Sequence, residues 1–369
     1  MSAPGRPRVA LVFGGRSSEH AVSCSTAASV LSVIDTDRYD VVPIGITTDG
    51  KWVLESRSPD RLTLTAGQVP EVDAAAASVV LSSDPARREL VVSPPGEAPR
   101  ALGQVDVVFP LLHGPWGEDG TLQGMLEMAG IRYVGAGVLA SALGMDKQYM
   151  KTVLTAAGLP VMPYVTVRPG DQPPTVVANA VETLGYPVFV KPARGGSSLG
   201  ISRVAAPEGL AAALEGAARY DPKVLVEAAA QGARELECGV LQSLEGPAEA
   251  SVVAEVASYG THPFYDFEAK YLGEEGVSLT VPAMLPERTA KQVRDLSLAA
   301  FEAIGCEGLA RVDFFWTPGD ELVVNEINTM PGFTPTSMYP RLWAASGVAY
   351  PELVERLLRL ALTRSTGLR

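Results

Sequence analysis

The chain has 369 residues, of which 47% are apolar and 20% charged, and its 30 lysines and arginines against 42 aspartates and glutamates give a net charge of −12. This apolar content is too high for a disordered chain, and the length predicts two or three packed units. The acidic balance disfavours a general binder of nucleic acid or anionic membranes, which needs clustered basic charge, but a few local cations would still suffice for a small phosphorylated ligand.

Targeting segments and disulfides are not expected. No apolar run approaches the length that crosses a bilayer, and the five apolar residues Val9 to Phe13 are too few for a signal peptide. Cys24, Cys238 and Cys306 are odd in number, far apart and set in apolar stretches, which predicts small buried side chains with free thiols. We therefore expect a cytoplasmic protein.

The first half of the chain alternates strand and helix patterns. Short apolar runs predict strands over residues 8–13, 40–47 and 105–112, with a helix over 19–34. Residues 56–103 are rich in Ala, Ser, Pro and Asp and predict a peripheral insertion with weak strand signals. Alternating strands and helices predict parallel βαβ units, whose ligands bind beyond the carboxyl ends of the strands.

A second unit begins near residue 143, where Asp146 is a suitable N-cap for a helix that stops at Gly158. The remaining predicted elements follow in chain order: strands over 164–167 and 188–192, a glycine-rich loop over 194–200, a strand over 223–227, a helix from 286 to 304, strands over 310–316 and 321–328, and a helix from 351. The expected domains are residues 1–143, 144–227 and 228–369.

The last two predicted strands carry an unusual group of polar side chains. Because side chains alternate along a strand, Arg311 and Asp313 share one face of the first of these strands. In the second strand, Glu326 and Asn328 share one face, and Asn325 is expected on the opposite face. If the strands pair, Asp313, Glu326 and Asn328 form an all-oxygen cluster of the kind that binds magnesium together with a phosphate. Two ordinary half-exposed strands would explain the same residues equally well.

Two further segments point to ligand binding. Lys191 leads into the loop 195–200, whose glycine backbone and serine hydroxyls suit a phosphate, although such loops are often simple turns. His113 begins the sequence HGPWGEDGT at the end of one predicted strand, and Glu19 follows another, so both strand ends are expected to face one crevice. An ordinary turn with an acidic helix start would account for the acidic residues, though not for the histidine. The sequence lacks GxSxG, HExxH and GxxxxGK[ST] motifs.

Six segments in order resemble the D-alanine–D-alanine ligases of the ATP-grasp superfamily: GGRSSEHAVS, HGPWGEDGT, VKPARGGSSLG, FYDFEAKY, ARVDFF and NEINTMPGFTPTSM. The resemblance runs from about residue 8 to the C-terminus and is weakest over 56–103. It implies an α/β (α+β) protein with a three-domain ATP-grasp fold and an N-terminal parallel-sheet (pre-ATP-grasp) domain. It also implies ATP-dependent joining of two D-alanines through an acyl phosphate, for peptidoglycan precursor synthesis.

The resemblance implies roles for individual residues on the nucleotide side. The ATP-binding set is Lys147, Lys191 and Lys270 at the phosphates, Glu227 and the backbone of Ala230 at the adenine, and Glu235 at the ribose. The ligands of two Mg²⁺ (or Mn²⁺) ions are Asp313, Glu326 and Asn328.

On the amino-acid side, Glu19, Ser197 and Tyr271 match a hydrogen-bonded set in which Glu19 holds the ammonium of the first D-alanine, and His113 lies near its carboxylate. Arg311 and the backbone N–H of Gly332 match the groups that stabilise the oxyanion, and Ser337 and Met338 match the carboxylate site of the second substrate. Residues 258–280 resemble the family's mobile loop.

The resemblance leaves two alternatives to a dipeptide-forming enzyme. The first is a relative that makes D-alanyl-D-lactate or D-alanyl-D-serine, which Tyr271 disfavours. The second is a nucleotide-binding protein that has lost catalysis, which the intact Arg311 disfavours, since a binding module does not require an oxyanion group. The expected partners are ATP, D-alanine and a second copy of the chain in a homodimer.

Overall fold

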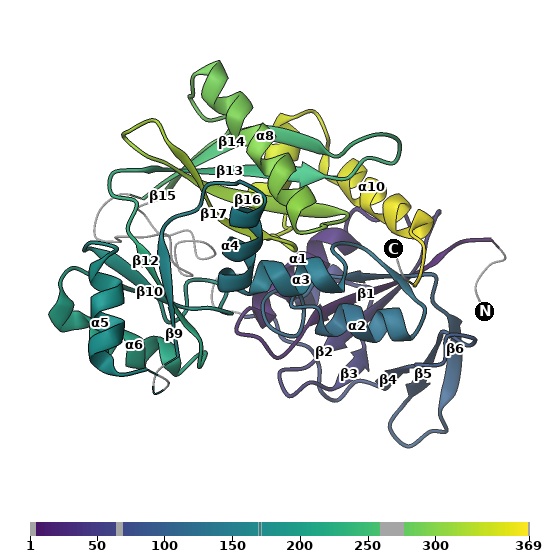
Figure 1. The fold of residues 1–369 in the computed structure, drawn as a ribbon. Coiled ribbons are helices and arrows are strands. Elements are labelled where there is room, and N and C mark those ends of the chain that lie inside the picture. Colours follow the sequence, from purple (N-terminus) through teal and green to yellow (C-terminus); the bar gives the residue numbers. More distant parts are fainter. Residues whose placement is uncertain (1–4, 64–68, 169, 171, 259–276, 368–369) are drawn as a thin grey trace.

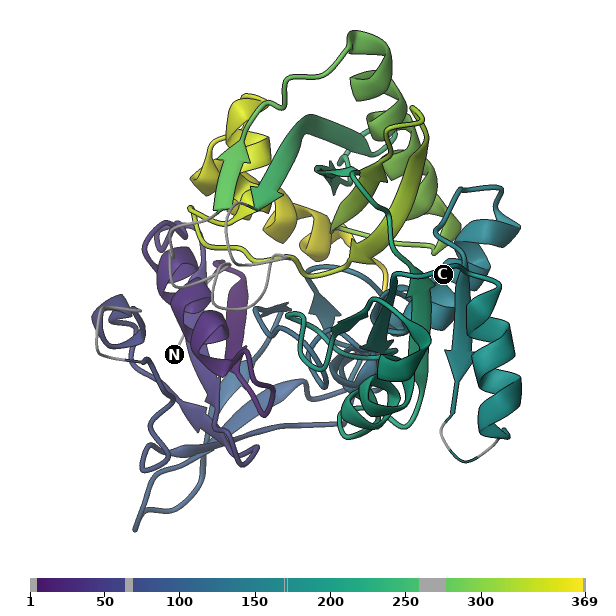
Figure 2. The ribbon, with the colours of Figure 1, turned by 90° about the vertical axis from the view of Figure 1, so that its left-hand side faces the viewer.

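The computed structural model describes residues 5–63, 69–168, 170, 172–258 and 277–367. The described residues form three sheets, each with its own helices (Figure 1). In Figure 2 the purple and blue N-terminal part lies below, the teal middle part to the right, and the green and yellow C-terminal part above. The mixed α/β architecture with a parallel-containing first sheet agrees with the fold class expected from the sequence.

The first sheet has eight strands in the order β6-β5-β4-β3-β2-β1-β7-β8. Its parallel part comprises β1 (Arg8–Gly14), β2 (Asp40–Ile46), β7 (Val107–Pro110) and β8 (Arg132–Tyr133). Its antiparallel edge comprises β3 (Trp52–Leu54), β4 (Ser78–Leu81), β5 (Glu89–Ser93) and β6 (Arg100–Gln104). Most of the segment 56–103 therefore extends this sheet at one edge.

Three helices and a short 3-10 turn belong to this first part. They are α1 (His20–Leu31), the turn Pro59–Leu62, α2 (Thr121–Met128) and α3 (Val138–Met145). The strands β1 and β7 are adjacent and parallel, with Val9 opposite Val107. Their carboxyl ends therefore meet at one edge, as the sequence predicted for the segments that carry Glu19 and His113.

The second sheet has four antiparallel strands in the order β11-β10-β12-β9. Its elements are α4 (Lys147–Ala156), β9 (Tyr164–Val167), α5 (Pro174–Glu182), β10 (Val188–Pro192), β11 (Ser202–Val204), a 3-10 turn (Pro207–Gly209), α6 (Leu210–Ala218) and β12 (Val224–Ala228). The predicted N-cap of α4 is confirmed, since the Asp146 carboxylate accepts hydrogen bonds from the backbone N–H groups of Gln148 and Tyr149.

The third sheet has five antiparallel strands in the order β15-β14-β13-β16-β17. Its elements are β13 (Arg234–Leu241), β14 (Glu249–Ser258), β15 (Val277–Thr280), α8 (Glu287–Ala303), β16 (Leu309–Trp316), β17 (Leu322–Asn328), α9 (Met338–Ala345) and α10 (Tyr350–Thr363). One apolar cluster joins β1, β7, α9 and α10, so the C-terminal helix packs against the N-terminal sheet.

Two expectations about single features can be compared with the fold. Cys24, Cys238 and Cys306 are free and buried, as predicted. Within the described ranges, no helix is long and apolar enough to cross a membrane.

Candidate active site

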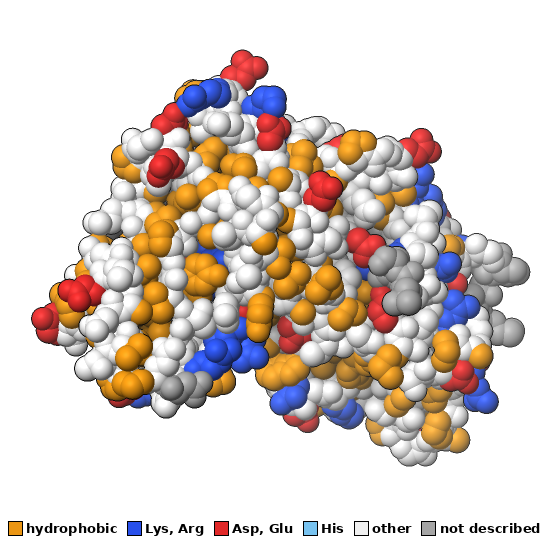
Figure 3. Space-filling view, in the orientation of Figure 1, with side chains coloured by type: hydrophobic (Ala, Val, Ile, Leu, Met, Phe, Trp, Pro, Cys, Tyr) orange, Lys and Arg blue, Asp and Glu red, His pale blue; other side chains and the backbone are white. Residues whose placement is uncertain are grey.

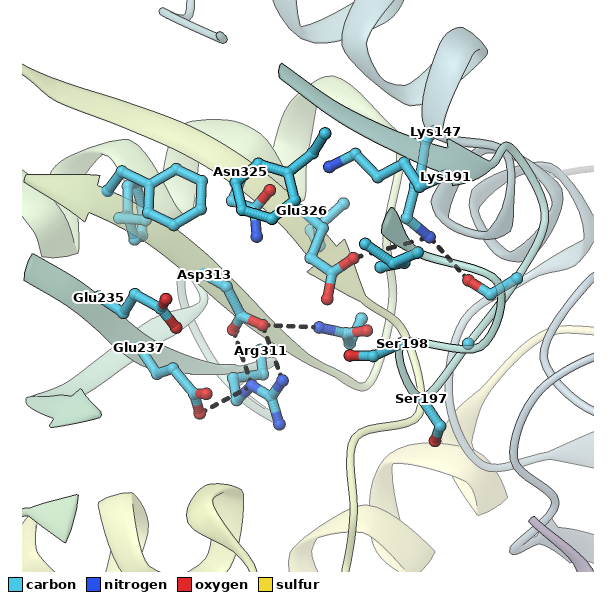
Figure 4. A pocket seen from close by; sticks show the side chains of 18 of the residues that line it. Lys147, Lys191, Ser197, Ser198, Glu235, Glu237, Arg311, Asp313, Asn325 and Glu326 are labelled. Atoms are coloured by element: carbon cyan, nitrogen blue, oxygen red, sulfur yellow. Dashed lines mark hydrogen bonds and ion pairs between the residues drawn. The ribbon is translucent and has the colours of Figure 1, made fainter. Parts of the chain in front are cut away.

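A cavity of about 610 Å³ lies where the three parts of the chain meet. Its walls come from the segments that follow β1 and β7, from the glycine-rich loop before β11, and from β12, β13, β16 and β17. Thirteen of the seventeen residues singled out by the sequence line it: Glu19, His113, Lys147, Lys191, Ser197, Glu227, Ala230, Glu235, Arg311, Asp313, Glu326, Asn328 and Gly332. Figure 4 shows part of this set.

Two adjacent strands bring the oxygen-bearing side chains together. The strands β16 and β17 pair antiparallel, with Asp313 opposite Glu326 and Arg311 opposite Asn328. The side-chain amide of Asn328 donates a hydrogen bond of 3.1 Å from Nδ2 to Asp313 Oδ2. The predicted pairing of these two strands is therefore confirmed, and it places two carboxylates and an amide on one wall of the cavity.

A β-bulge in β17 corrects one sequence expectation. The two strands shift register beyond the pair Asp313–Glu326, so that Asn325 has no residue opposite it in the ladder. Asn325, Glu326 and Ile327 all line the cavity. The side chains of Asn325 and Glu326 are both half-buried, while Val324 and Ile327 on either side are 0% and 1% exposed. The expectation that Asn325 lies on the side opposite Glu326 is wrong, because a bulge interrupts the two-residue alternation of a strand.

Arg311 is held between two carboxylates (Figure 4). Its Nε and Nη2 donate to the two oxygens of Asp313, both at 2.7 Å, and its Nε also lies 2.9 Å from Glu237 Oε2. Burial opposes the charge, but the carboxylates of Asp313 and Glu237 outweigh it and raise the pKa of Arg311 above its usual range. The guanidinium therefore stays charged in a fixed orientation. The sequence analysis missed Glu237, although its position on β13 opposite Asp313 places it on the same wall.

A buried cluster of two lysines and one glutamate lies at one side of the cavity, where Lys191 and Glu227 line the wall and Lys151 lies behind it. Lys191 Nζ lies 2.9 Å from Glu227 Oε1, and Lys151 Nζ lies 2.7 Å from Glu227 Oε2. Burial disfavours the charged form of Glu227, but the two lysines outweigh it and lower the pKa of the carboxyl. Lys151 was not identified from the sequence. A possible signal was its position four residues after Lys147, on the same face of α4.

Lys147 connects the glycine-rich loop with the wall formed by β16 and β17. This lysine donates a hydrogen bond of 2.7 Å to the carbonyl oxygen of Gly195 and lies 3.8 Å from Glu326 Oε2. In the same loop Ser197 and Ser198 have φ angles of +48° and +59°. Such left-handed conformations are strained for residues other than glycine and are most often found where a backbone is shaped for a ligand.

Glu19 lies where loops from two parts of the chain converge. The hydroxyl of Ser197 donates a hydrogen bond to Glu19 Oε1, which joins the glycine-rich loop to the N-terminal unit. A Cβ added to Gly114 or to Gly196 would lie 2.9 or 3.1 Å from Glu19 Oε2, so the backbone of both loops approaches this carboxylate closely, and Gly114 also has a φ of +76° that favours glycine. The hydroxyl of Ser17 in turn donates to the carbonyl oxygen of His113.

Burial shifts the pKa values of two titratable groups at the end of β7 toward their neutral forms. His113 Nδ1 lies 3.1 Å from the carbonyl oxygen of Met330 and must donate to it, and burial lowers the pKa of the ring against the opposing charge of Glu19. Glu118 also lines the cavity and accepts from the backbone N–H of Gly114 at 2.6 Å. Burial, followed by the charge of Glu19, raises the pKa of Glu118 to about 8. Sequence reasoning missed Glu118 because this shift depends on burial.

The structure places the remaining sequence-predicted residues away from the cavity or does not describe them. Ser337 accepts a hydrogen bond at 3.2 Å from the backbone N–H of Thr334, and neither it nor Met338 lines the cavity. Met338 packs instead in an apolar cluster with β14. Lys270 and Tyr271, with most of the segment 258–280, lie outside the described residues.

The polar residues on the wall formed by β16 and β17 fit magnesium by their chemistry. Asp313, Glu326 and Asn328 offer only hard oxygen donors, and the amide nitrogen of Asn328 is directed to Asp313, which leaves its oxygen for a cation. Within the part of the chain that the structure describes, no three His, Cys, Asp or Glu side chains form a metal site by themselves. The set therefore fits a cation that also takes ligands from a phosphate.

The amino-acid sequence matches two protein-family models along most of its length. Residues 8–136 match the D-ala D-ala ligase N-terminus, and residues 153–359 match the D-ala D-ala ligase C-terminus. The chain belongs to the D-alanine–D-alanine ligase family. Its membership confirms the resemblance that six short segments indicated.

Curated D-alanine–D-alanine ligases are similar over their whole length. The enzyme of Kineococcus radiotolerans is 59% identical, with 100% of both chains covered. That of Streptomyces griseus is 57% identical, with 99% of this chain and 95% of its own covered.

Solved structures of ligases share the ATP-grasp fold of this chain. The VanG D-Ala:D-Ser ligase from Enterococcus faecalis superimposes with a TM-score of 0.85 at 34% identity, covering 97% of this chain and 100% of its own. The D-alanine-D-alanine ligase from Coxiella burnetii gives a TM-score of 0.81 at 33% identity, covering 97% and 94%. The fold class expected from the sequence is confirmed.

Proposed function

We propose that this protein joins two D-alanines to D-alanyl-D-alanine at the expense of ATP, for peptidoglycan precursor synthesis. The observation that carries the proposal is a single cavity with three features: an anionic pocket at Glu19, a cation-rich wall at Lys147 and Lys191, and a fixed guanidinium at Arg311. An amino acid, a nucleotide and a developing oxyanion would each find a group of opposite charge in it.

The nucleotide binds between the second and third sheets in this proposal. Glu227, held by two lysines, accepts from the amino group of adenine, with the backbone of Ala230 and the carboxylate of Glu235 alongside. Lys147 and Lys191, together with Lys270, supply point charges for the phosphates. Asp313, Glu326 and Asn328 would hold two Mg²⁺ ions, which supply charge neutralisation during phosphoryl transfer when bound.

The first D-alanine binds with its ammonium at Glu19, which Ser197 and Tyr271 orient, and with its carboxylate near His113. That carboxylate attacks the γ-phosphate and forms an acyl phosphate with release of ADP. The amine of the second D-alanine then attacks the acyl carbon, and Arg311 and the backbone N–H of Gly332 stabilise the oxyanion before phosphate leaves. Ser337 and the main chain of Met338 remain proposed contacts for the carboxylate of the second D-alanine. Neither residue lines the described cavity, so in this proposal the second D-alanine extends beyond its wall.

A substrate panel tests the proposed reaction. Purified protein with ATP and Mg²⁺ is given D-alanine, L-alanine, D-serine or D-lactate, each alone and each together with D-alanine, phosphate release is followed, and products are identified by mass. We expect release only with D-alanine and a product with the mass of the dipeptide. Phosphate release without a dipeptide would contradict the proposal. A mixed product from D-alanine and D-serine would instead assign the specificity named for the VanG enzyme.

The metal assignment has its own test in Glu326→Gln. The neutral amide cannot supply the anionic ligand, so we expect turnover to be abolished while the melting temperature changes little. The matched control is Glu321→Gln, an exposed carboxylate just before β17. Retained turnover of Glu326→Gln at saturating Mg²⁺ would remove Glu326 from the metal site.

A homodimer is part of the proposal, and exposed apolar side chains on two neighbouring helices support it. Met128 on α2 and Leu139 on α3 are 77% and 67% exposed, and Figure 3 has hydrophobic side chains over these helices. The double variant Met128→Glu, Leu139→Lys should then be monomeric by light scattering, and an unchanged mass would place any interface elsewhere. The same proposal places the protein in the cytoplasm, because ATP is supplied there.

A further inference from the structure

Lys151 on α4 lies behind the wall of the cavity. Its side chain is 0% exposed, and it is absent from the residues that line the cavity. A fully buried lysine is rare, because the ammonium loses its hydration, and it normally requires a partner. This residue therefore needs a reason for its position.

The ammonium of Lys151 makes contacts with both walls of the nucleotide site. Its Nζ lies 2.7 Å from Glu227 Oε2 on β12, which belongs to the second sheet. The same Nζ donates a hydrogen bond of 3.2 Å to the carbonyl oxygen of Asn325 on β17, which belongs to the third sheet. Asn325 is the bulge residue that directly precedes Glu326. The ammonium of Lys151 therefore contacts both the carboxylate of Glu227 and the backbone next to Glu326.

The charge of Lys151 also changes the balance around Glu227. With Lys191 on Oε1 and Lys151 on Oε2, two positive charges share one negative charge. Without Lys151, Lys191 would be the sole described counter-ion of a carboxylate that is 3% exposed. Lys191 would then be held more tightly to Glu227 and would be less available to a phosphate.

We propose that Lys151 is a positioning residue for nucleotide binding. Its ammonium fixes the orientation of Glu227 on β12 and of the bulge at Asn325 on β17, and so maintains the distance between these two walls of the site. The inference rests on the proposed use of ATP. It assigns no contact with substrate to Lys151, which acts through Glu227 and Glu326.

The test compares Lys151→Met with a matched control. Methionine keeps the length of the apolar stem but removes the charge and the donor. Lys223→Met is the control, because Lys223 forms a buried ion pair with Asp146 at the start of the same helix but does not line the cavity. Affinity for ADP with Mg²⁺ is measured by calorimetry without D-alanine, and KM values for ATP and D-alanine are measured separately.

For Lys151→Met we expect the Kd for ADP and the KM for ATP to rise tenfold or more, and the KM for the first D-alanine to change less than threefold. For Lys223→Met we expect less than a threefold change in all three. In a protein that already carries Glu227→Gln, Lys151→Met should weaken ADP binding by less than the tenfold that it causes alone. A purely structural role would give equal losses in both lysine variants and no such coupling.

Two results would overturn the proposal. One is a folded Lys151→Met protein whose nucleotide affinity lies within threefold of the wild type, and the other is an equal loss in Lys223→Met. If Lys151→Met does not fold, Lys151→Gln keeps hydrogen-bond donors without the charge, and the same limits apply to it. Because ADP affinity is measured without turnover, a wild type that binds nucleotide but makes no dipeptide would contradict the proposed function and leave this inference testable.

Discussion

Arg311 is preorganised by the protein before any substrate arrives. Its two carboxylate partners, Asp313 and Glu237, fix the guanidinium at the wall of the cavity. In the proposed reaction the side chain would then not need to reorient. This arrangement suits a group that stabilises a charge appearing only in the transition state.

Arg311→Ala should therefore lower kcat by about 100-fold or more, the loss typical of one oxyanion donor, while the Kd for ADP changes only a few-fold. The substitution also leaves two buried carboxylates without this partner, so the melting temperature should fall. Arg234→Ala is the control, because Arg234 forms a comparable two-pronged pair with Glu255 in the same sheet. If nucleotide affinity fell as much as kcat, Arg311 would be a ground-state binding group.

Glu118 gives a pH-dependent prediction. Its pKa is raised to about 8 in the folded state from an ordinary value of 4.5, chiefly by burial and then by the charge of Glu19. Between these values the folded protein keeps a proton that the unfolded chain has lost, so the free energy of unfolding falls as pH rises, by at most about 1.4 kcal/mol per unit from this group.

The neutral variant Glu118→Gln removes this dependence. Its melting temperature relative to the wild type should increase steadily from pH 5 to pH 8 and then level off. Thermal unfolding of both proteins in matched buffers measures the difference, and all other titrating groups are common to the two. A difference that stays constant over this range would mean that Glu118 ionises normally in the folded protein.

Among the elements, α4 carries two lysines of the site, Lys147 in its first turn and Lys151 in its second. The helix begins at the Asp146 cap, whose carboxylate also pairs with Lys223. The capping contacts and the ion pair use the same side chain, so a pair of substitutions separates them.

Asp146→Asn should keep the cap, since asparagine caps as well as aspartate, and lose the ion pair with Lys223. Asp146→Ala should lose both and be less stable than Asp146→Asn by about 1 kcal/mol. Urea unfolding of the two variants measures this difference directly. Equal free energies of unfolding would show that the cap contributes nothing to α4 in this protein.

At the level of the whole molecule, the C-terminal end of the chain joins its first and last parts. Following α10, the Arg364 guanidinium donates to the carbonyl oxygens of Tyr133 and Gly135 and pairs with Glu307 at 2.5 Å. It also stacks on the ring of Tyr133, with 4.1 Å between the guanidinium carbon and the ring centroid. Helix α10 is thereby fastened to the N-terminal sheet, far from the cavity.

Arg364→Ala should lower the free energy of unfolding by about 2 kcal/mol or more, less than for a fully buried ion pair, because Glu307 is 31% exposed. The kcat of the folded protein should stay unchanged. Arg356→Ala on the same helix breaks two exposed pairs, with Glu352 and with Glu249, and should cost about 0.5 kcal/mol. Equal losses in the two variants would contradict the anchoring role of Arg364.

Local sequence patterns were sufficient to predict much of this protein. Short apolar runs predicted β1 and β2, Asp146 predicted the start of α4, and six short segments indicated the family. These features could be predicted because each depends on residues close together in the chain, through backbone preferences, side-chain alternation or capping.

Other features depend on segments that meet only in the folded chain. The bulge at Asn325 follows from the register between β16 and β17, and the pairing of Lys151 with the carbonyl of Asn325 joins residues 174 positions apart. The raised pKa of Glu118 requires a cavity wall that removes water from its carboxyl group. Register, long-range pairing and desolvation are properties of packed surfaces, and a local pattern specifies which face of an element is apolar but not which other face it will meet.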